Sequence, residues 1–249
     1  LVQAKGTFYT YYGPTFKDET RETTFEQRYL DTVIQRTDCF SQLREIARGN
    51  GGIVHKAEYR SATTSDSQMV DVAIKSCNVI DVAANHRLLV EARLMLLMKH
   101  PAIIPLVGIH LFKTSRPWMV TSFMVNGDLK MHLRALRQSQ LNSNNSDGVT
   151  KFTDEDAIQV ATKLAGALAY LNRIGVIHGD IAARNVLCGS PATNVVLSDF
   201  GKAIPARLAS QGNLGDRYSA AGPAVPFRWM APEALLESIL SHESDVWSF

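Results

Sequence analysis

Hydrophobic residues follow different patterns in the two halves of the chain. In the first half, short runs rich in β-branched residues predict strands at 70–75 and 118–121. Between them, at 81–99, apolar residues recur at helical spacing until Pro101 ends the run. The first half therefore predicts strands with one long helix.

The second half has a mostly helical pattern. A helix is predicted at 127–137, and the Ser/Asn-rich stretch 138–151 after it is predicted to be a solvated loop. Thr153 is the predicted N-cap of the next helix, because Asp156 follows at the capping-box position. The apolar stripe of this helix is interpreted as buried core that supports the segment after Gly175, not as a cofactor site. Its members are Ala157, Ala161, Leu164, Leu168 and Leu171.

Two polar clusters flank a short predicted hairpin in the second half. Its strands are predicted at 186–188 and 195–197, on either side of turn-forming residues. This hairpin would bring Asp180, Asn185 and Asp199 to the same end of a small sheet. One aspartate could then accept a proton, while Asn185 and Asp199 supply the hard oxygen ligands that Mg²⁺ prefers.

The same two clusters carry a resemblance to a known family. Residues 177–185 and 197–201 resemble the catalytic loop H-R-D-x-x-x-x-N and the metal-binding motif D-F-G of protein kinases. D-F-G alone is a weak signal, because a surface turn could carry the same three residues. Both motifs in this order and at this separation make the resemblance specific. The Ala-Ala-Arg insert at 182–184 is similar to that of tyrosine kinases, whereas serine/threonine kinases usually place a lysine two residues after the aspartate.

Three further motifs in the first half agree with this resemblance. Residues 46–54 look like the glycine-rich loop, with Ala47 at the position of its first glycine, although a plain hairpin turn would use the same residues. Residues 72–75 match V-A-I-K, so Lys75 is predicted to bind phosphates and not merely to end a strand. Glu91 matches the helix-C glutamate and is predicted to form an ion pair that holds Lys75 on the phosphates; the alternative is a solvated surface residue.

The end of the chain carries a second group of tyrosine-kinase features. Residues 226–233 closely match the peptide-docking loop and A-P-E motif of tyrosine kinases. Residues 244–249 resemble the start of the large central helix of the C-lobe. The segment before 226 contains Tyr218, which is the candidate phosphosite.

The resemblance implies a site for ATP and Mg²⁺. Asp180 would orient a tyrosine hydroxyl and accept its proton, and Arg184 would help to place the phenol ring. Asn185 and Asp199 would hold Mg²⁺, while Lys75 would contact the α- and β-phosphates. The residues expected around the nucleotide are Ile46, Ala47, Gly49, Gly52, Val54, Ala73, Lys75, Thr121, Ser122, Met124 and Leu187.

Gly179 departs from the family pattern, which nearly always has arginine at this position. That arginine usually pairs with a phosphorylated residue of the activation loop and so links phosphorylation to loop order. Glycine offers no charge and is predicted to loosen the backbone beside Asp180. We therefore expect phosphorylation of Tyr218 to activate this chain less than it activates arginine-bearing relatives.

By resemblance the fold is α+β and two-lobed, with a small antiparallel sheet and one helix in the N-lobe and a mainly helical, incomplete C-lobe. Residues 1–42 are predicted to be a lead-in or juxtamembrane-like segment with a short helix at 26–35, and the kinase domain is expected at 43–249. The expected parts of this domain are an N-lobe at about 43–121, a hinge at about 122–126 and a partial C-lobe at about 127–249. Because the large helix is cut at Phe249, the fragment alone is expected to be poorly stable and inactive.

The composition sets limits on the function. A formal net charge of +2 is too small to indicate binding to nucleic acid or to a membrane surface. The three cysteines are widely spaced, which favours a reducing compartment over a disulfide framework or a zinc site. With no signal peptide and no apolar run of membrane-spanning length, a cytoplasmic location is expected. Membrane association is expected only through parts before Leu1, as in the intracellular part of a receptor.

Three functions are open at this point. The leading hypothesis is a protein-tyrosine kinase that phosphorylates tyrosine-containing protein substrates. The second is a pseudokinase that binds nucleotide or partners with little transfer, which Gly179 and Ala47 slightly favour. The third is a serine/threonine or dual-specificity kinase, which the sequences at 182–184 and 226–229 disfavour.

Overall fold

The computed structural model describes residues 33–34, 39–49, 51–60, 69–78, 82–110, 117–142, 152–209 and 227–249. The chain divides into two units. The first comprises Leu1–Lys99 and Pro105–Phe123, and the second comprises His100–Ile104 and Met124–Phe249. Each unit has its own buried hydrophobic cluster.

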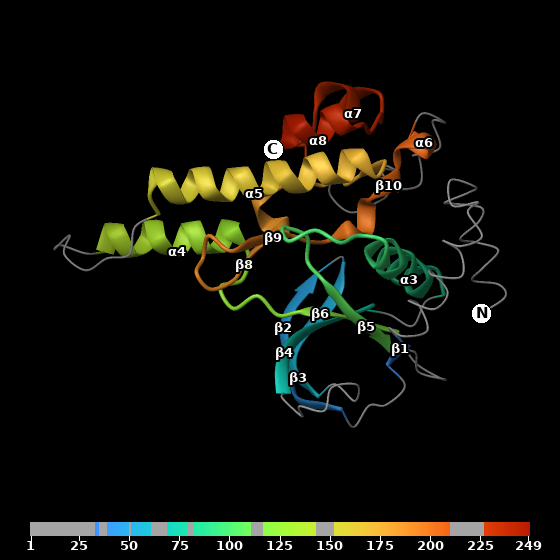
Figure 1. Ribbon diagram of the computed structural model, residues 1–249, viewed down its shortest axis with the longest axis vertical. Coiled ribbons are helices and arrows are strands. Elements are labelled where there is room, and N and C mark those ends of the chain that lie inside the picture. The colour runs from blue at the N-terminus through green and yellow to red at the C-terminus, as the bar shows by residue number, and fades with distance from the viewer. Residues whose placement is uncertain are drawn as a thin grey trace. The chain divides into compact units, whose positions relative to one another are not determined.

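The first unit is built around a six-stranded sheet with the strand order β1-β5-β6-β4-β3-β2 (Figure 1). Its strands are β1 (Val33–Ile34), β2 (Phe40–Gly49), β3 (Gly52–Arg60), β4 (Met69–Ser76), β5 (Leu106–His110) and β6 (Trp118–Ser122). Apart from the short parallel pair β1 and β5, neighbouring strands are antiparallel. The antiparallel sheet predicted for the N-lobe is confirmed.

The first edge of this sheet corrects one prediction. A helix was predicted at 26–35, but Val33–Ile34 is a strand that pairs with Ile109 and His110 of β5. Both residues are β-branched, and pairing with a strand distant in sequence overrides the local helical pattern. The rest of 26–35 lies outside the described residues.

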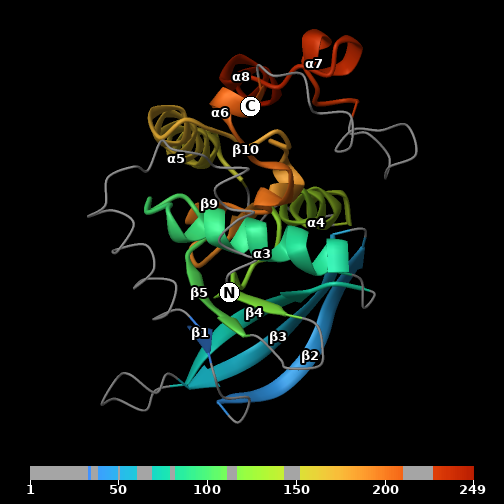
Figure 2. The same cartoon turned by 90° about the vertical axis from the view of Figure 1, so that its right-hand side faces the viewer.

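Helix α3 (Val82–Leu96) packs on the sheet against β5 and β6 (Figures 1 and 2). In β4, Val72 and Ile74 are buried while Ala73 between them is half-buried, as expected for a strand whose alternate side chains face opposite sides. Val72 and Ile74 pack with Ala57 and Val120 in the core of this unit. The strand predicted at 70–75 is therefore confirmed.

The second unit contains two long helices, of which α4 (Leu129–Asn142) is the first. The carboxylate of Asp128 accepts a hydrogen bond from the backbone N–H of Met131 at 2.9 Å, which caps the start of the helix. The helix runs past residue 137, so the prediction of a loop is wrong at 138–142. Ser139 is accommodated because its hydroxyl donates to the carbonyl of Ala135 at 3.0 Å. Residues 143–151 lie outside the described residues.

The second long helix, α5 (Asp154–Arg173), begins as predicted with a capping box between Thr153 and Asp156. It ends before Gly175, whose φ of 67° lies in the left-handed region that favours glycine. The predicted apolar stripe is only partly correct, because Ala157 and Ala161 are exposed. The buried residues are Val160, Ala167 and Leu171, with Leu164 and Leu168 half-buried.

The buried stripe of α5 follows from what the helix contacts. It packs against β7, β9 and α8, and only the face turned to these elements is covered. The remaining elements of this unit are β7 (Val176–Ile177), η2 (Ala183–Asn185), β8 (Val186–Cys188), β9 (Val195–Leu197), η3 (Phe200–Lys202), β10 (Ile204–Pro205), α6 (Ala206–Ala209), α7 (Pro232–Leu236) and α8 (His242–Ser248). None of the helices within the described residues is long and apolar enough to cross a bilayer.

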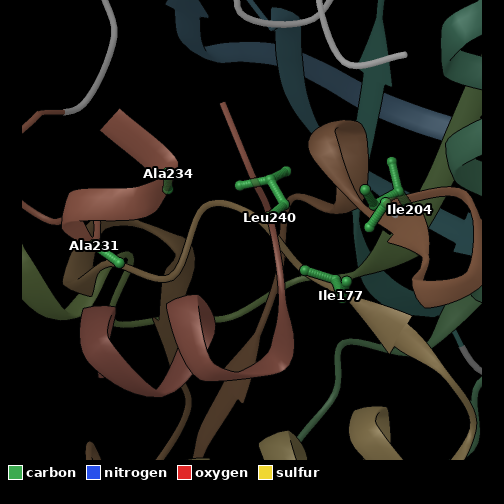
Figure 3. Close-up of a cluster of buried hydrophobic side chains, with 6 residues drawn as sticks. Ile177, Ile204, Ala231, Ala234 and Leu240 are labelled. Atoms are coloured by element: carbon green, nitrogen blue, oxygen red, sulfur yellow. The ribbon is translucent and has the colours of Figure 1, made fainter. Parts of the chain in front are cut away.

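A buried cluster joins the middle of this unit to its last helices. Ile177 and Ile204, from the paired strands β7 and β10, pack with Ala231, Ala234 and Leu240 (Figure 3). This packing anchors the segment around α7 beside the strand that leads into the catalytic-loop motif.

Three large hydrophobic side chains at the end of the described chain are exposed to solvent. In α8 and just after it, Val246, Trp247 and Phe249 are 62%, 64% and 53% exposed. These side chains were predicted to have few partners within this chain, and their exposure agrees with that prediction.

Candidate active site

The hairpin β8–β9 positions the polar clusters of the second unit. Its register pairs Val186 with Leu197. Immediately beyond this pair, the backbone carbonyl of Asn185 accepts hydrogen bonds from the N–H of Ser198 at 2.8 Å and from its hydroxyl at 2.9 Å. Asn185 and Asp199 therefore lie at the same end of the hairpin, as predicted.

Asp180 is the centre of a dense hydrogen-bond cluster. Arg184 donates from Nη2 to Oδ1 at 2.5 Å, and Nζ of Lys202 lies 3.3 Å from the same oxygen. Asn185 donates from Nδ2 to Oδ2 at 3.1 Å and to the Asp180 backbone carbonyl at 2.7 Å. The Asp180 side chain is only 10% exposed, so three donors fix the orientation of a largely buried carboxylate.

Arg184 links this cluster to the loop that begins at 226. Its guanidinium lies over the ring of Trp229, with Cζ 5.1 Å from the ring centroid. Trp229 belongs to the tyrosine-kinase-like octapeptide at 226–233, of which Pro226 lies outside the described residues. The structure thus brings two of the tyrosine-kinase features, distant in sequence, into direct contact.

His178 supports the backbone beneath Asp180. Its Nδ1 accepts a hydrogen bond from the Asp180 N–H at 3.2 Å, so the ring proton is assigned to Nε2, which lies 3.1 Å from the Ser198 carbonyl. The ring is fully buried and packs edge-on against Phe200, with centroids 4.8 Å apart. His178 therefore joins the segment of Asp180 to the segment of Asp199.

Asp245 in α8 holds the same backbone from the other side. Its two carboxylate oxygens accept hydrogen bonds from the N–H groups of His178 at 2.7 Å and Gly179 at 2.9 Å. Burial raises the pKa of the Asp245 carboxyl, and the nearby His178 and the two amide hydrogen bonds act in the opposite direction. The sequence analysis did not assign Asp245 this role, because a contact spanning 66 residues or more leaves no local signal.

Gly179 has a φ of 72°, in the left-handed region. A residue with a Cβ pays about 1–2 kcal/mol to adopt this conformation. The sequence predicted that glycine would loosen the backbone beside Asp180. The structure corrects this prediction, because the Gly179 N–H is held by Asp245 and glycine adopts the required φ without strain.

Asp199 also has left-handed backbone geometry, with a φ of 61°. Such a conformation is uncommon outside glycine and costs about 1–3 kcal/mol, so the surrounding structure must enforce it. The next residue, Phe200, is 1% exposed and anchors η3 in the core. Strained backbone of this kind clusters at functional sites, which is consistent with a role for Asp199.

The donor set of Asn185 and Asp199 fits Mg²⁺. Mg²⁺ is usually held by one or two protein carboxylates together with substrate phosphates, not by an all-protein cage. The described residues contain no cluster of three or more His, Cys, Asp or Glu side chains that could hold a metal. Asn185 uses Nδ2 for both bonds to Asp180, so the amide oxygen is the atom it would offer to a metal.

In the first unit, Lys75 and Glu91 form the predicted ion pair. Nζ of Lys75 lies 2.9 Å from each carboxylate oxygen of Glu91. The two side chains are 16% and 4% exposed, so the pair is largely removed from water. The alternative of a solvated glutamate is excluded, and α3 fixes the position of the lysine at the end of β4.

The glycine-rich segment forms the turn between β2 and β3. Gly52 has a φ of 122°, and a Cβ there would lie 2.2 Å from the carbonyl oxygen of Ser76. Only glycine therefore allows β4 to approach this closely. Ala47 lies within β2, opposite Val54, and is not among the positive-φ residues. The missing first glycine therefore causes no backbone strain.

The other residues expected around the nucleotide are divided between the units. In the first unit, the register places Ala73 opposite Thr121 and Lys75 opposite Val54, with Ser122 at the end of β6. Ile46 lies in β2 and is 42% exposed, and Gly49 ends this strand. In the second unit, Leu187 lies in β8 and forms a bridge with Asp128, and Met124 packs near Gly189. Tyr218 lies outside the described residues.

Comparison with known proteins agrees with this geometry. Residues 40–249 match the family model described as protein tyrosine and serine/threonine kinase. The chain belongs to this family. The match extends over both units and includes strands β2 to β6, α3, the β8–β9 hairpin and α8.

Curated relatives include receptor and other tyrosine kinases. Insulin receptor-related protein of Mus musculus is 33% identical over 210 residues, which cover 83% of this chain and 15% of that protein. Tyrosine-protein kinase TXK of Homo sapiens is 32% identical, with coverage of 83% and 34%. Receptor tyrosine-protein kinase erbB-2 of Mus musculus is 33% identical, with coverage of 87% and 16%. The chain thus spans about 15% of the length of the insulin receptor-related protein.

Proposed function

We propose that this kinase domain is an active protein-tyrosine kinase that transfers the γ-phosphate of ATP to tyrosine hydroxyls of protein substrates. The main support is the geometry around Asp180, whose carboxylate is held by Arg184 and Asn185 while Arg184 also contacts Trp229. The intact Lys75–Glu91 pair supports the same proposal. The similarity to two proteins named as tyrosine kinases, TXK and erbB-2, supports the choice of tyrosine as acceptor.

In the proposed reaction, Asp180 accepts a hydrogen bond from the phenol O–H and takes its proton. The phenol oxygen forms a bond to the γ-phosphorus as the bond from that phosphorus to the bridging oxygen of ADP breaks. The proton passes to the Asp180 carboxylate. Because the chemistry needs little covalent help, positioning and charge neutralisation account for most of the rate.

The other residues position the nucleotide. Lys75, fixed by Glu91, contacts the α- and β-phosphates through its ammonium group. Asn185 and Asp199 hold Mg²⁺, which neutralises charge on the phosphates when it is bound. The backbone of Ser122 and Met124 takes part in adenine recognition, and apolar side chains such as Ala73 and Leu187 contact the base.

Arg184 is proposed to place the acceptor ring. Its side chain is 30% exposed while Nη2 is bound to Asp180, so the side chain is partly accessible to an incoming phenol. Trp229 packs on the guanidinium and limits its rotation. A serine acceptor, with a shorter side chain, would gain nothing from this arrangement.

The setting of the reaction is part of the same proposal. ATP and tyrosine-containing proteins are the proposed partners, and the cytoplasm is the proposed location, either of a cytosolic kinase or of the intracellular part of a receptor. Within the described residues, Cys39, Cys77 and Cys188 form no disulfide with one another, which is consistent with a reducing compartment.

A pseudokinase is the second candidate, and Gly179 is the observation that favours it. Without arginine at this position, one established link between loop phosphorylation and loop order is missing. Ala47 no longer favours this alternative, because it occupies β2 without strain.

Transfer of radiolabelled phosphate from ATP to a poly-Glu/Tyr peptide tests the proposal in the full-length protein. Asp180→Asn is expected to reduce transfer by about 10²–10³-fold or more while nucleotide binding is retained. Asp154→Asn, an exposed aspartate at the start of α5, is the matched control and should behave as wild type. Nucleotide binding without transfer by the wild type would establish a pseudokinase, and equal transfer by Asp180→Asn would refute the role of Asp180.

A further inference from the structure

Lys202 is a charged residue at the candidate site that the sequence analysis did not assign. It is the last residue of η3, and its Nζ lies 3.3 Å from Oδ1 of Asp180. Its side chain is 32% exposed, so the ammonium is neither buried in the core nor fully solvated. The contact joins the D-F-G segment directly to the carboxylate proposed as the catalytic base.

The donors around Asp180 are distributed unevenly between its two oxygens. A carboxylate offers about four lone-pair sites, roughly two on each oxygen. Oδ1 faces both cations, Arg184 at 2.5 Å and Lys202 at 3.3 Å. Oδ2 receives one neutral amide, from Asn185 at 3.1 Å. Among the described residues, Oδ2 therefore has fewer donors than Oδ1 and is the oxygen with room for a further hydrogen bond.

We propose that Lys202 is a positioning residue for phosphoryl transfer, which with Arg184 occupies Oδ1 of Asp180 so that the acceptor hydroxyl donates to Oδ2. This inference rests on the proposed function. Two cations on Oδ1 keep the carboxylate from exchanging its oxygens by rotation, and the proton of the phenol is directed to one defined atom. Lys202 does not accept or donate that proton.

A purely structural role for Lys202 explains less. The segment around it is held independently, because Phe200 is 1% exposed and β10, which follows η3, pairs with β7. The N–H of Ala203 also donates to the carbonyl of Phe200 at 3.0 Å. An ion pair exposed to this extent adds little to stability in general. What the Lys202 contact does change is the environment of Oδ1.

The net charge of the cluster formed by Asp180, Arg184 and Lys202 also supports a role of Lys202 in phosphoryl transfer. Asp180 with Arg184 alone would be neutral, whereas Lys202 makes the group net positive beside the place where anionic phosphoryl oxygens would arrive. A fixed positive charge at such a place stabilises the transition state more than it stabilises a freely hydrated substrate. Removal of Lys202 should therefore act mainly on kcat.

The test compares Lys202→Met with Lys202→Arg in the full-length protein, using steady-state kinetics with ATP and a tyrosine peptide. Lys202→Met is expected to lower kcat about 10-fold, less than the roughly 10²-fold that a misplacement of about 1 Å can cause. KM for ATP should stay within about twofold, and Lys202→Arg should restore most of kcat. Lys163→Met is the matched control, since Lys163 is an exposed lysine whose Nζ donates to the backbone carbonyl of Thr193 at 2.8 Å.

Each outcome of this experiment decides the inference. An unchanged kcat in Lys202→Met, with an active wild type, overturns the role of Lys202 and leaves the proposed function intact. A loss that Lys202→Arg does not restore, with a parallel fall in thermal stability, shows a structural tether and also overturns it. An inactive wild type overturns the proposed function, and the role of Lys202 falls with it.

Discussion

The two units of this kinase domain each carry an ion-pair cluster, and the clusters are built differently. In the first unit, Nζ of Lys75 lies 2.9 Å from both carboxylate oxygens of Glu91, and the two side chains are 16% and 4% exposed. In the second unit, Asp180 is 10% exposed but its partners Arg184 and Lys202 are 30% and 32% exposed. The first pair is neutral and enclosed, and the second is net positive and partly open.

This difference separates two kinds of function. An enclosed pair with both carboxylate oxygens bound to one ammonium fixes the lysine at the end of β4. An open cluster with an excess of positive charge can still contact a ligand. We therefore expect mutations of the Lys75–Glu91 pair to lower the free energy of unfolding strongly. Mutations of Arg184 and Lys202, the partners of Asp180, should mainly lower kcat.

Glu91→Gln should have the largest effect on stability. It removes the carboxylate that binds the largely buried ammonium of Lys75, and breaking such a pair typically costs about 3–5 kcal/mol. The free energy of unfolding, from urea titration of the full-length protein, should fall by about 3 kcal/mol, and transfer activity should fall with it. Glu45→Gln is the control, because Glu45 pairs with Arg48 on the surface, and no measurable change is expected. Equal stabilities of Glu91→Gln and wild type would refute the distinction between the two clusters.

Asp245→Asn should have the second-largest effect on the free energy of unfolding. An amide side chain offers one acceptor oxygen, so one of the N–H groups of His178 and Gly179 loses its partner in a buried site, at a cost of about 1–3 kcal/mol. Because burial raises the pKa of Asp245, the folded state holds its proton more tightly than the unfolded state. This group's contribution to stability is therefore greatest at low pH and declines as pH rises through the raised pKa. The difference in free energy of unfolding between wild type and Asp245→Asn should become smaller as the pH rises through the raised pKa of Asp245. A difference that grows with pH would contradict the raised pKa of this carboxyl.

Gly179→Arg introduces the residue typical of the family. The φ of 72° should make it less stable than wild type by about 1–2 kcal/mol, and Gly179→Ala should lose a similar amount. Only the arginine variant gains a charge that can pair with a phosphorylated loop. Tyr218→Phe should therefore reduce turnover more in the Gly179→Arg background than in the wild type. A large loss in the wild-type background would show that activation does not need a charge at residue 179.

Arg184→Gln should have the smallest effect on stability and a clear effect on turnover. The pair of Arg184 with Asp180 is partly open to solvent, and such pairs contribute about 0–1 kcal/mol. Loss of the guanidinium removes a donor from Oδ1 and the contact with Trp229, so kcat for tyrosine peptides should fall by at least about 10-fold. A fall in stability as large as that of Glu91→Gln would remove the contrast between the two clusters.

Sequence reasoning succeeded where the signal is local. The capping box at Thr153, the hairpin strands at 186–188 and 195–197, and the placement of Asn185 and Asp199 at one end of that hairpin depend on a few neighbouring residues. It failed where distant contacts decide the outcome. Ala157 and Ala161 fit the helical period but are exposed, and Val33–Ile34 follows a helical pattern but pairs with β5.

The amino-acid sequence by itself determined the family, the order of the motifs and the candidate residues, because each motif is a short run whose chemistry depends on residue type and spacing. Only the tertiary structure decided which oxygen of Asp180 each cation occupies, that Asp245 holds the backbone of His178 and Gly179, and that Gly179 has a left-handed conformation. The contacts of Lys202 with Asp180 and of Asp245 with His178 and Gly179 join segments separated by more than 20 residues, such as the 67 between His178 and Asp245. No local pattern encodes such contacts, because they form only when packing and burial bring the segments together.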